Sequence, residues 1–351
     1  MNETLMKRDR ADQIAMAPCC LGESHALFHR EEETPFGRTG RFLLLDLASG
    51  TAEPTRLKPS PCANGADFVT AGGQFFFYFE RYPSFAICRF DPVSRETVNA
   101  AELSTRVHAF RADGDWLAYT LEPQPGIRRP ETFELVNWKT GERSMISPAD
   151  GAEGYTASRW GFVNGRIYRV CRDDSWQDGA GNSLKNRIAC YDLAAETITA
   201  VAVLPEGITV AELLVREDTL WFTGETATEK SLWQCRPGEE APRKVLQVRH
   251  DSYAQVTEMQ LREKGFFWLV KEMHSLLETS STLWQYDFEK EESILMIKLA
   301  DFRALDISFQ VVGNWLYYAD PLWKQPCCTP LDEPLTRETV ALPENGNHQN
   351  A

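Results

Sequence analysis

The sequence contains few of the residues and short patterns by which enzymes and metal proteins are usually identified. It has 6 His in 351 residues, and its 9 Cys form no C-x-x-C pair. Neither a phosphate-binding G-x-x-x-x-G-K-[ST] loop nor a G-x-G-x-x-G dinucleotide fingerprint occurs. These absences predict no cofactor, no zinc-type metal cluster, and thiols that are mostly buried and reduced.

Long apolar runs and positive charge are also scarce. No stretch approaches the ~20 apolar residues that a bilayer span requires, and residues 1–20 carry charges instead of the apolar run of a signal peptide. The formal net charge is -14, with 37 Lys and Arg against 51 Asp and Glu. An acidic surface repels phosphate backbones. We therefore expect a cytoplasmic monomer that binds neither nucleic acid nor membrane.

The sequence shows little helical periodicity. Its regular feature is instead a repeat. A turn followed by an aromatic-rich strand recurs along the chain, as in "GGQFFFYFE" (72–80) and "VGNWLYYAD" (312–320). Glycine suits such turns because it readily takes positive φ. Taken as anchors, the turn residues are spaced by 41 to 53 residues, and they are Gly22, Gly73, Gly114, Gly165, Asp218, Gly265 and Gly313.

A second turn follows each anchor and usually carries Asp or Asn, whose side chain can bond the backbone of its own turn. Each unit therefore holds two hairpins, or four strands, and this period is typical of a propeller blade. The residues of these second turns are Asp46, Asp91, Asn137, Asp192, Cys235, Asp287 and Asp332.

The sequence thus predicts an all-β fold, a single seven-bladed β-propeller with four-stranded antiparallel blades. The alternative, two stacked β-sandwiches, would make the regular period accidental. The predicted blades cover approximately residues 12–58, 64–104, 105–149, 156–204, 208–248, 253–300 and 304–343, and polar tails cover 1–11 and 344–351.

Two segments carry a resemblance to known repeats. "YDLAAETI" (191–198), and "LYYAD" (316–320) followed by "ETVAL" (338–342), resemble repeats of the YWTD, TolB-like and PQQ-like propeller superfamilies. The resemblance implies the fold and carries no function. The Trp-Asp dipeptide of WD40 repeats is missing, and so is the regular Trp of the PQQ-like families, so quinone binding is not implied.

Long loops on a rigid scaffold are where binding usually occurs. In a blade the loop between the second and third strands lies on the same face as the connections between blades. These loops are long in blades 1, 3 and 4, at 30–41, 122–132 and 172–186. Blades 3 and 4 are neighbours, so we expect a binding surface in which Trp176 is an exposed anchor; its residues are Arg128, Arg129, Arg172, Asp173, Asp174, Trp176 and Lys185. The alternatives are that Trp176 folds back onto the blade and that the charged residues pair with one another.

Weaker candidates for chemistry remain. His250 and Asp251 form an acid–base dipeptide between blades 5 and 6, and His108 or His274 could serve at the mouth of the central channel. "GESHA" (22–26) is close to G-x-S-x-G, but a hairpin is not the strand-to-helix turn of a nucleophile elbow. A calcium site is conceivable in the blade 4 loop, with Asp173, Asp174, Asp178 and Asn182 as oxygen ligands.

These observations favour a binding scaffold over an enzyme. We expect the long-loop face to bind a protein or a small anionic ligand. The alternatives are a propeller-type hydrolase or lyase with its site at the channel mouth, and a sensor domain that binds a small ligand.

Overall fold

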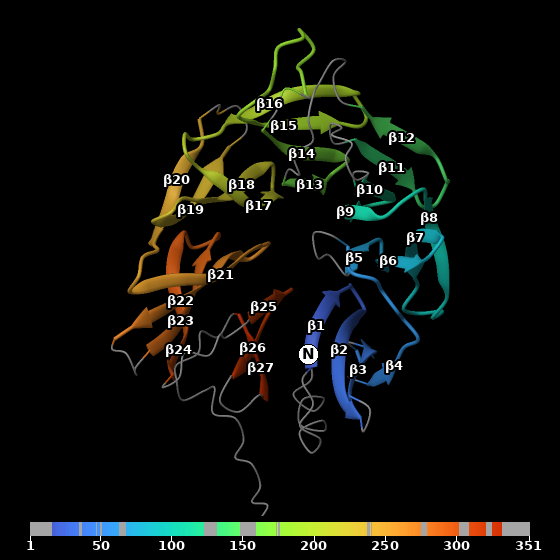
Figure 1. Cartoon of the computed structure of the whole chain (residues 1–351), viewed down its shortest axis with the longest axis horizontal. Coiled ribbons are helices and arrows are strands. Elements are labelled where there is room, and N and C mark those ends of the chain that lie inside the picture. Colours follow the sequence, from blue (N-terminus) through green and yellow to red (C-terminus); the bar gives the residue numbers. More distant parts are fainter. Residues whose placement is uncertain are drawn as a thin grey trace, which may run out of the picture.

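The chain folds into β-strands arranged around a ring (Figure 1). The structure is a computed structural model of the whole chain. It describes residues 16–34, 37–46, 48–49, 51–62, 68–122, 132–147, 159–172, 174, 176–236, 239, 241–274, 279–301, 309–320 and 325–331. Within these residues there are 27 strands and no helix, hence none long and apolar enough to cross a membrane.

The strands form antiparallel sheets that follow one another along the chain. Six sheets have four strands each, in the order of the sequence, and we call them blades 1 to 6. Blades 1 to 3 are β1 (Met16–Leu21), β2 (His25–Thr34), β3 (Gly37–Asp46) and β4 (Ala52–Pro54); β5 (Phe68–Ala71), β6 (Gln74–Arg81), β7 (Ser84–Phe90) and β8 (Thr97–Leu103); and β9 (Val107–Asp113), β10 (Trp116–Leu121), β11 (Phe133–Asn137) and β12 (Arg143–Ile146). Blades 4 to 6 are β13 (Trp160–Val163), β14 (Arg166–Cys171), β15 (Arg187–Asp192) and β16 (Thr197–Val203); β17 (Thr209–Arg216), β18 (Thr219–Glu225), β19 (Glu229–Cys235) and β20 (Arg243–Arg249); and β21 (Ala254–Arg262), β22 (Gly265–Met273), β23 (Thr279–Asp287) and β24 (Glu292–Asp301).

The last sheet has three strands, β25 (Phe309–Val312), β26 (Trp315–Asp320) and β27 (Gln325–Pro330). The first strand of every sheet lies nearest the centre of the ring (Figure 1). Neighbouring inner strands contact one another in the circuit β1–β5–β9–β13–β17–β21–β25–β1. The three-stranded sheet therefore closes the ring between blade 6 and blade 1.

The predicted β-propeller with four-stranded antiparallel blades is confirmed, but the predicted number of seven such blades is wrong. The structure has six, and the sheet β25–β27 has three strands among the described residues. The prediction counted a turn motif at Asp332 as the outer hairpin of the last unit, and a turn motif alone does not show that the chain beyond it pairs as a strand. The turn predicted at Asp332 lies outside the described residues.

Apolar side chains fill the spaces between successive sheets. Each of the six seams between sheets that follow one another along the chain has its own cluster of buried residues; the cluster between blades 3 and 4, for example, joins Phe133 and Leu135 to Trp160 and Ile167. The cluster between blades 2 and 3 contains Phe76. The sheets therefore pack face to face through aromatic residues such as Phe76 and Phe133.

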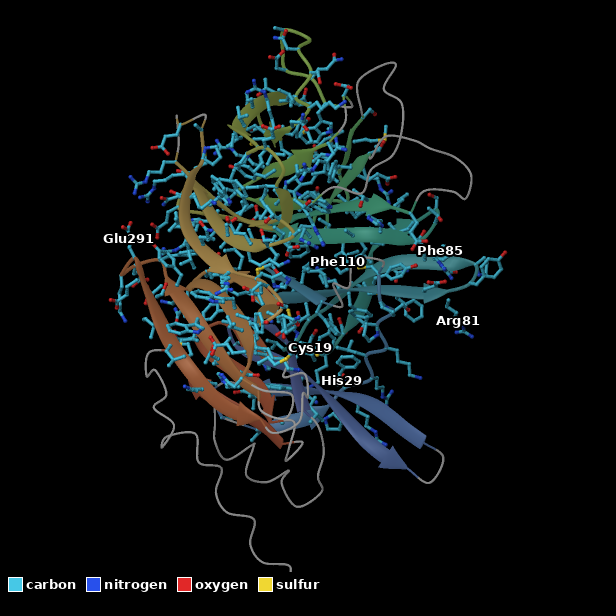
Figure 2. The ribbon with its side chains drawn as sticks, turned by 60° about the vertical axis from the view of Figure 1, so that its left-hand side comes forward. Cys19, His29, Arg81, Phe85, Phe110 and Glu291 are labelled. Atoms are coloured by element: carbon cyan, nitrogen blue, oxygen red, sulfur yellow. The ribbon has the colours of Figure 1, made fainter. Side chains whose placement is uncertain are left out.

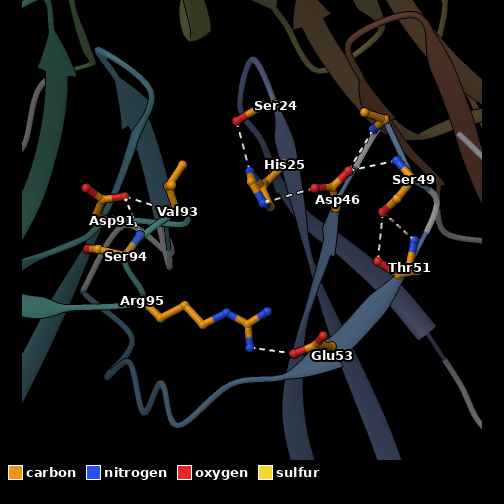
Figure 3. Close-up of polar contacts among 11 residues, drawn as sticks. Ser24, His25, Asp46, Ser49, Thr51, Glu53, Asp91, Val93, Ser94 and Arg95 are labelled. Atoms are coloured by element: carbon orange, nitrogen blue, oxygen red, sulfur yellow. Dashed lines mark hydrogen bonds and ion pairs between the residues drawn. The ribbon is translucent and has the colours of Figure 1, made fainter.

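The two turn types have different causes. In the inner turn of blade 4, Asn164 and Gly165 both take positive φ, 52° and 67°, which suits a tight hairpin. In the outer turns, an Asp or Asn side chain accepts backbone N–H groups two and three residues ahead. Asp91 accepts those of Val93 and Ser94 at 2.8 and 3.2 Å (Figure 3). The same arrangement occurs at Asp46, Asn137, Asp192 and Asp287.

Candidate functional site

The two faces of the ring carry different connections. One face holds the inner and outer turns, and the other, the long-loop face, holds the loops from second to third strands and the connections between sheets. Arg81, beside the β6–β7 turn, and Glu291, in the β23–β24 turn, lie on opposite sides of the ring (Figure 2). The binding surface expected from the sequence belongs to the long-loop face.

The loop after β14 does not present Trp176 to solvent. The Trp176 side chain is fully buried, with its ring 5.8 Å from that of Phe133 in blade 3. Arg172 donates a hydrogen bond to the carbonyl of Ile208 at 2.9 Å. Trp176 therefore belongs to the core between blades 3 and 4 and is not the exposed anchor that the sequence suggested.

The charged residues of this loop mostly bond within it. Lys185 Nζ lies 3.7 Å from the carboxylate of Asp174, which also accepts a hydrogen bond from Ser183 Oγ at 2.5 Å. This pairing matches the alternative in which the charges order the loop. Arg128, Arg129 and Asp173 lie outside the described residues.

The suggested calcium ligands are also engaged. One oxygen of Asp178 accepts the backbone N–H groups of Ala180 and Asn182, and the other accepts the Asn182 side-chain amide at 3.0 Å. The hydrogen bonds from Asn182 hold the pKa of Asp178 below its usual range. Within the part of the chain that the structure describes, no group of three or more His, Cys, Asp or Glu side chains is placed to hold a metal ion.

His250 and Asp251 do not face each other as an acid–base pair. His250 Nδ1 accepts the backbone N–H of Val256 at 3.0 Å, and Asp251 accepts those of Tyr253 and Ala254. Both side chains thus fold the connection between blades 5 and 6. His274 is on the long-loop side of blade 6, with Nε2 2.7 Å from Ser280 Oγ.

Blade 1 brings a serine, a histidine and an aspartate together (Figure 3). Ser24 Oγ is 2.9 Å from His25 Nδ1, and His25 Nε2 is 3.8 Å from Asp46 Oδ2. A nucleophilic triad needs a hydrogen bond on both sides of the imidazole, and 3.8 Å is too long for one. The other oxygen of Asp46 already caps the outer turn. This arrangement is a turn structure and not a nucleophile elbow.

A more unusual group of charges lies on the inner strands of blades 3 to 6. Arg111 of β9, Arg159 beside β13 and Arg262 of β21 each act electrostatically on Glu212 of β17, and Arg111 and Arg159 also act on each other. Arg262 Nη1 is 3.8 Å from Glu212 Oε2. Burial raises the pKa of Glu212 above its usual value, and the arginines oppose that shift.

Arg111 and Arg159 differ from Arg262 in their pairing. Among the described residues, no carboxylate lies within ion-pair distance of Arg111 or Arg159. Arg111 instead donates to the carbonyl of Phe110 at 2.7 Å and lies over the ring of Trp160, 5.3 Å from its centroid. Phe110 itself is buried near the inner part of the ring (Figure 2).

His108 belongs to the same region. It lies near the start of β9, and burial lowers its pKa, with Arg159 adding to the effect and Glu122 opposing it. Of the histidines proposed from the sequence, it is the one beside this arginine group. Arg111 and Glu212 were missed, although a charged residue inside an otherwise apolar inner strand, as in "HAFRAD" (108–113), is a readable signal.

Comparisons with known proteins agree on the fold. No protein-family model matches the sequence, and no curated protein matches it. A solved oligogalacturonate lyase in complex with manganese superposes with a TM-score of 0.54 at 11% identity, covering 90% of each chain. An oligogalacturonate lyase from Vibrio parahaemolyticus superposes with a TM-score of 0.55 at 12% identity, again covering 90% of each chain. The chain is thus a β-propeller, as the resemblance of its repeats implies.

Proposed function

We propose that the protein is a ligand-binding β-propeller that takes a small anionic ligand on its long-loop face, at the inner ends of blades 3 to 5. The observation that carries this proposal is that Arg111 and Arg159 act on each other electrostatically while no described carboxylate lies within ion-pair distance of either; Glu212 acts on both at longer range. Like charges held together cost free energy. A bound anion offsets that cost and makes charge-assisted hydrogen bonds with guanidinium groups.

The charge of the whole protein sharpens this proposal. Its formal net charge is -14, so the bulk of the surface repels anions, and a bound anion must be held by local contacts. Burial of Trp176 removes the anchor that a docking protein would use, which favours the small ligand over the protein partner. Location in the cytoplasm and the monomeric state stay predictions.

The two lyases suggest a first probe. Their names refer to oligogalacturonate, an oligosaccharide with a carboxylate on each sugar, and their similarity to this chain extends to the fold alone. An acidic oligosaccharide therefore belongs in the screen beside citrate and inorganic phosphate. A neutral galactose oligosaccharide of equal length is the matched control.

The test measures affinity by calorimetry at low and at physiological ionic strength. We expect an anion of the screen to bind, and Arg111→Gln and Arg159→Gln each to weaken binding by about tenfold or more, which corresponds to ~1.4 kcal/mol. Arg143→Gln, an exposed arginine of outer strand β12, is the control and should bind as the wild type does. Equal affinity in all variants, or no binding of any anion, would reject the proposal.

A second candidate function uses the same place. Glu212, with its raised pKa beside three arginines, has the character of a general base. It would take the proton from the carbon next to a ligand carboxylate; the carbon–oxygen bond at the adjacent carbon would break as the carbon–carbon double bond forms, and water would protonate the departing oxygen. Ultraviolet absorbance of an unsaturated uronate, present with wild type and absent with Glu212→Gln, would support a lyase. No absorbance change with either protein leaves binding as the function.

A further inference from the structure

Glu212 lies between two arginines that stand toward opposite faces of the ring. It is the fourth residue of β17, whose neighbours around the centre of the ring are β13 and β21 (Figure 1). Each inner strand runs from the long-loop face to the face that holds the turns. Arg159 comes just before β13, at the long-loop end, and Arg262 is the last residue of β21, at the turn end. Glu212 therefore has one arginine on its long-loop side and one on its turn side.

The two oxygens of the Glu212 carboxylate have different surroundings. Oε2 accepts the backbone N–H of Leu261 and lies 3.8 Å from Arg262 Nη1. Among the described residues, neither a hydrogen bond nor an ion pair reaches Oε1. The side chain is 33% exposed, so part of it is open to water. Oε1 is therefore the oxygen that can take a proton while Oε2 keeps its link to β21.

The charges around Glu212 do not balance. Arg111, Arg159 and Arg262 each act on it electrostatically, and only Arg262 is close enough for an ion pair. Guanidinium groups cannot be deprotonated in proteins. Glu212 is therefore the member of this group that can change its charge, and its carboxylate is the counter-charge that Arg111 and Arg159 share at longer range.

Other titratable groups border the same arginines and must be separated from Glu212 in any test of pH. Each of them interacts with one arginine of the group. They are Glu258 of β21 at Arg262, His108 of β9 at Arg159, and the buried thiol of Cys62 at Arg111. A thiol titrates near ~8.5, so measurements below that pH leave the charge of Cys62 unchanged.

A bound anion changes the balance at Glu212. Its negative charge beside Arg111 and Arg159 repels the carboxylate, and a nearby like charge disfavours the ionised form of an acid. Burial acts in the same direction and is the main cause of the raised pKa of Glu212. A proton on Oε1 removes the repulsion, preserves the hydrogen bond from Leu261 to Oε2, and leaves the arginines to the ligand.

We propose that an anion binds to Arg111 and Arg159 together with a proton, which Glu212 takes from solvent. In the free protein the Glu212 carboxylate is the counter-charge of the two arginines, and in the complex the ligand replaces it. This inference rests on the proposed function and adds the regulation of that site: acid strengthens binding, and a rise in pH releases the ligand.

The test measures the affinity for sulfate and for D-galacturonate by calorimetry from pH 5.0 to pH 7.5, a range in which both anions keep their charge. We expect the affinity of the wild type to fall as pH rises, by up to about tenfold per pH unit for one linked proton. Repeating the titration in buffers of different ionisation enthalpy counts the protons taken up on binding.

Glu212→Gln is the deciding variant because it keeps an amide oxygen for Leu261 and has no proton to exchange. We expect it to bind both anions with no dependence on pH and no proton uptake, and to bind about tenfold or more tightly than the wild type at pH 7.5. His108→Gln and Glu258→Gln each remove another titratable group and should keep the pH dependence of the wild type. Urea unfolding of each variant at pH 7 checks that it is folded.

The outcomes separate this inference from the proposed function. Binding that requires Arg111 and Arg159 but has the same pH dependence in Glu212→Gln and wild type overturns the inference and leaves the proposed function standing. Loss of the pH dependence in His108→Gln, with Glu212→Gln unchanged, likewise overturns it and assigns the proton to the imidazole. Failure of sulfate, D-galacturonate and every anion of the screen to bind overturns both.

Discussion

The carboxylate of Glu212 in β17 accepts a hydrogen bond from the backbone N–H of Leu261 in β21 and so joins blade 5 to blade 6. A β-bulge between Val210 and Leu213 includes Glu212, and bulges redirect side chains. A similar hydrogen bond crosses the next seam, where Glu258 of β21 accepts the backbone N–H of Phe309 in β25 at 3.2 Å. Acidic side chains of inner strands therefore hold neighbouring sheets together.

Removing this link should destabilise the ring. In Glu212→Ala the N–H of Leu261, a buried residue, loses its acceptor, and we expect the free energy of unfolding in urea to fall by about 1–3 kcal/mol. Glu212→Gln keeps an acceptor oxygen and should stay within about 1 kcal/mol of the wild type. Equal stability of Glu212→Ala and wild type would contradict a role for this bond in holding the seam.

The same residue makes a prediction about pH. Because burial raises the pKa of Glu212, the folded protein holds a proton there more tightly than the unfolded chain does. The contribution of this group to stability therefore falls as pH rises from about 4.3 through the raised value. Turn aspartates act in the opposite sense: the hydrogen bond from Ser49 lowers the pKa of Asp46, so its contribution is lost as pH falls.

The difference in unfolding temperature between Glu212→Gln and the wild type reports on Glu212 alone, because the turn aspartates are present in both proteins. Unfolding temperatures measured from pH 4 to pH 8 should show the variant gaining on the wild type as pH rises, since glutamine has no proton to lose. A difference that stays constant across this range would show that Glu212 has the same pKa in the folded and unfolded chain.

The sequence predicts local features of this fold better than those that depend on packing between blades. Asp91 and Asn137 could be assigned to capped turns because an Asx turn is built within a few residues. Trp176 was misplaced because its neighbours in the sequence are charged, whereas its neighbours in space include Phe133 of the preceding blade. Glu212 was missed because its hydrogen-bond partner is 49 residues away. The three-stranded sheet was not predicted because the motif at Asp332 resembles the outer turns of the other units, and a local turn motif does not show whether a fourth strand pairs after it.

Because Trp176 is buried, we expect its mutation to reduce the stability of the fold. Trp176→Ala creates a cavity in the seam between blades 3 and 4, and we expect it to lower the free energy of unfolding by about 3–5 kcal/mol. Lys185→Ala in the same loop removes an exposed contact with Asp174 and should change stability by less than about 1 kcal/mol. Urea unfolding measures both. A Trp176→Ala protein as stable as Lys185→Ala would mean that the indole is not part of the core.

At the second position of its inner turn, blade 5 has a side chain at positive φ where blade 4 has glycine. Glu217 and Asp218 take φ values of 48° and 63°, the conformation that Asn164 and Gly165 adopt in blade 4. Residues with a Cβ adopt this region at a cost in free energy, which is smallest for Asn and Asp. Asp218→Gly should therefore raise the free energy of unfolding by about 0.5 kcal/mol.

Gly165→Ala is the reciprocal variant. No atom lies within 4 Å of the position that its Cβ would take, so backbone strain alone should lower the stability of Gly165→Ala by about 1 kcal/mol. Thermal unfolding of both variants tests the pair. A drop in stability for Asp218→Gly would show that the Asp218 side chain contributes more than the strain costs.

Mutation of His250 can distinguish a role in stability from a role in ligand binding. Its Nδ1 accepts the backbone N–H of Val256, a buried residue, so His250→Ala leaves that N–H without an acceptor. We expect the free energy of unfolding to fall by about 1–3 kcal/mol and the affinity for any anion that binds at Arg111 to stay unchanged. His274→Ala, on the same face of blade 6 and exposed, is the control for loss of an imidazole. A His250→Ala protein with wild-type stability and binding weakened tenfold or more would instead place His250 in the site.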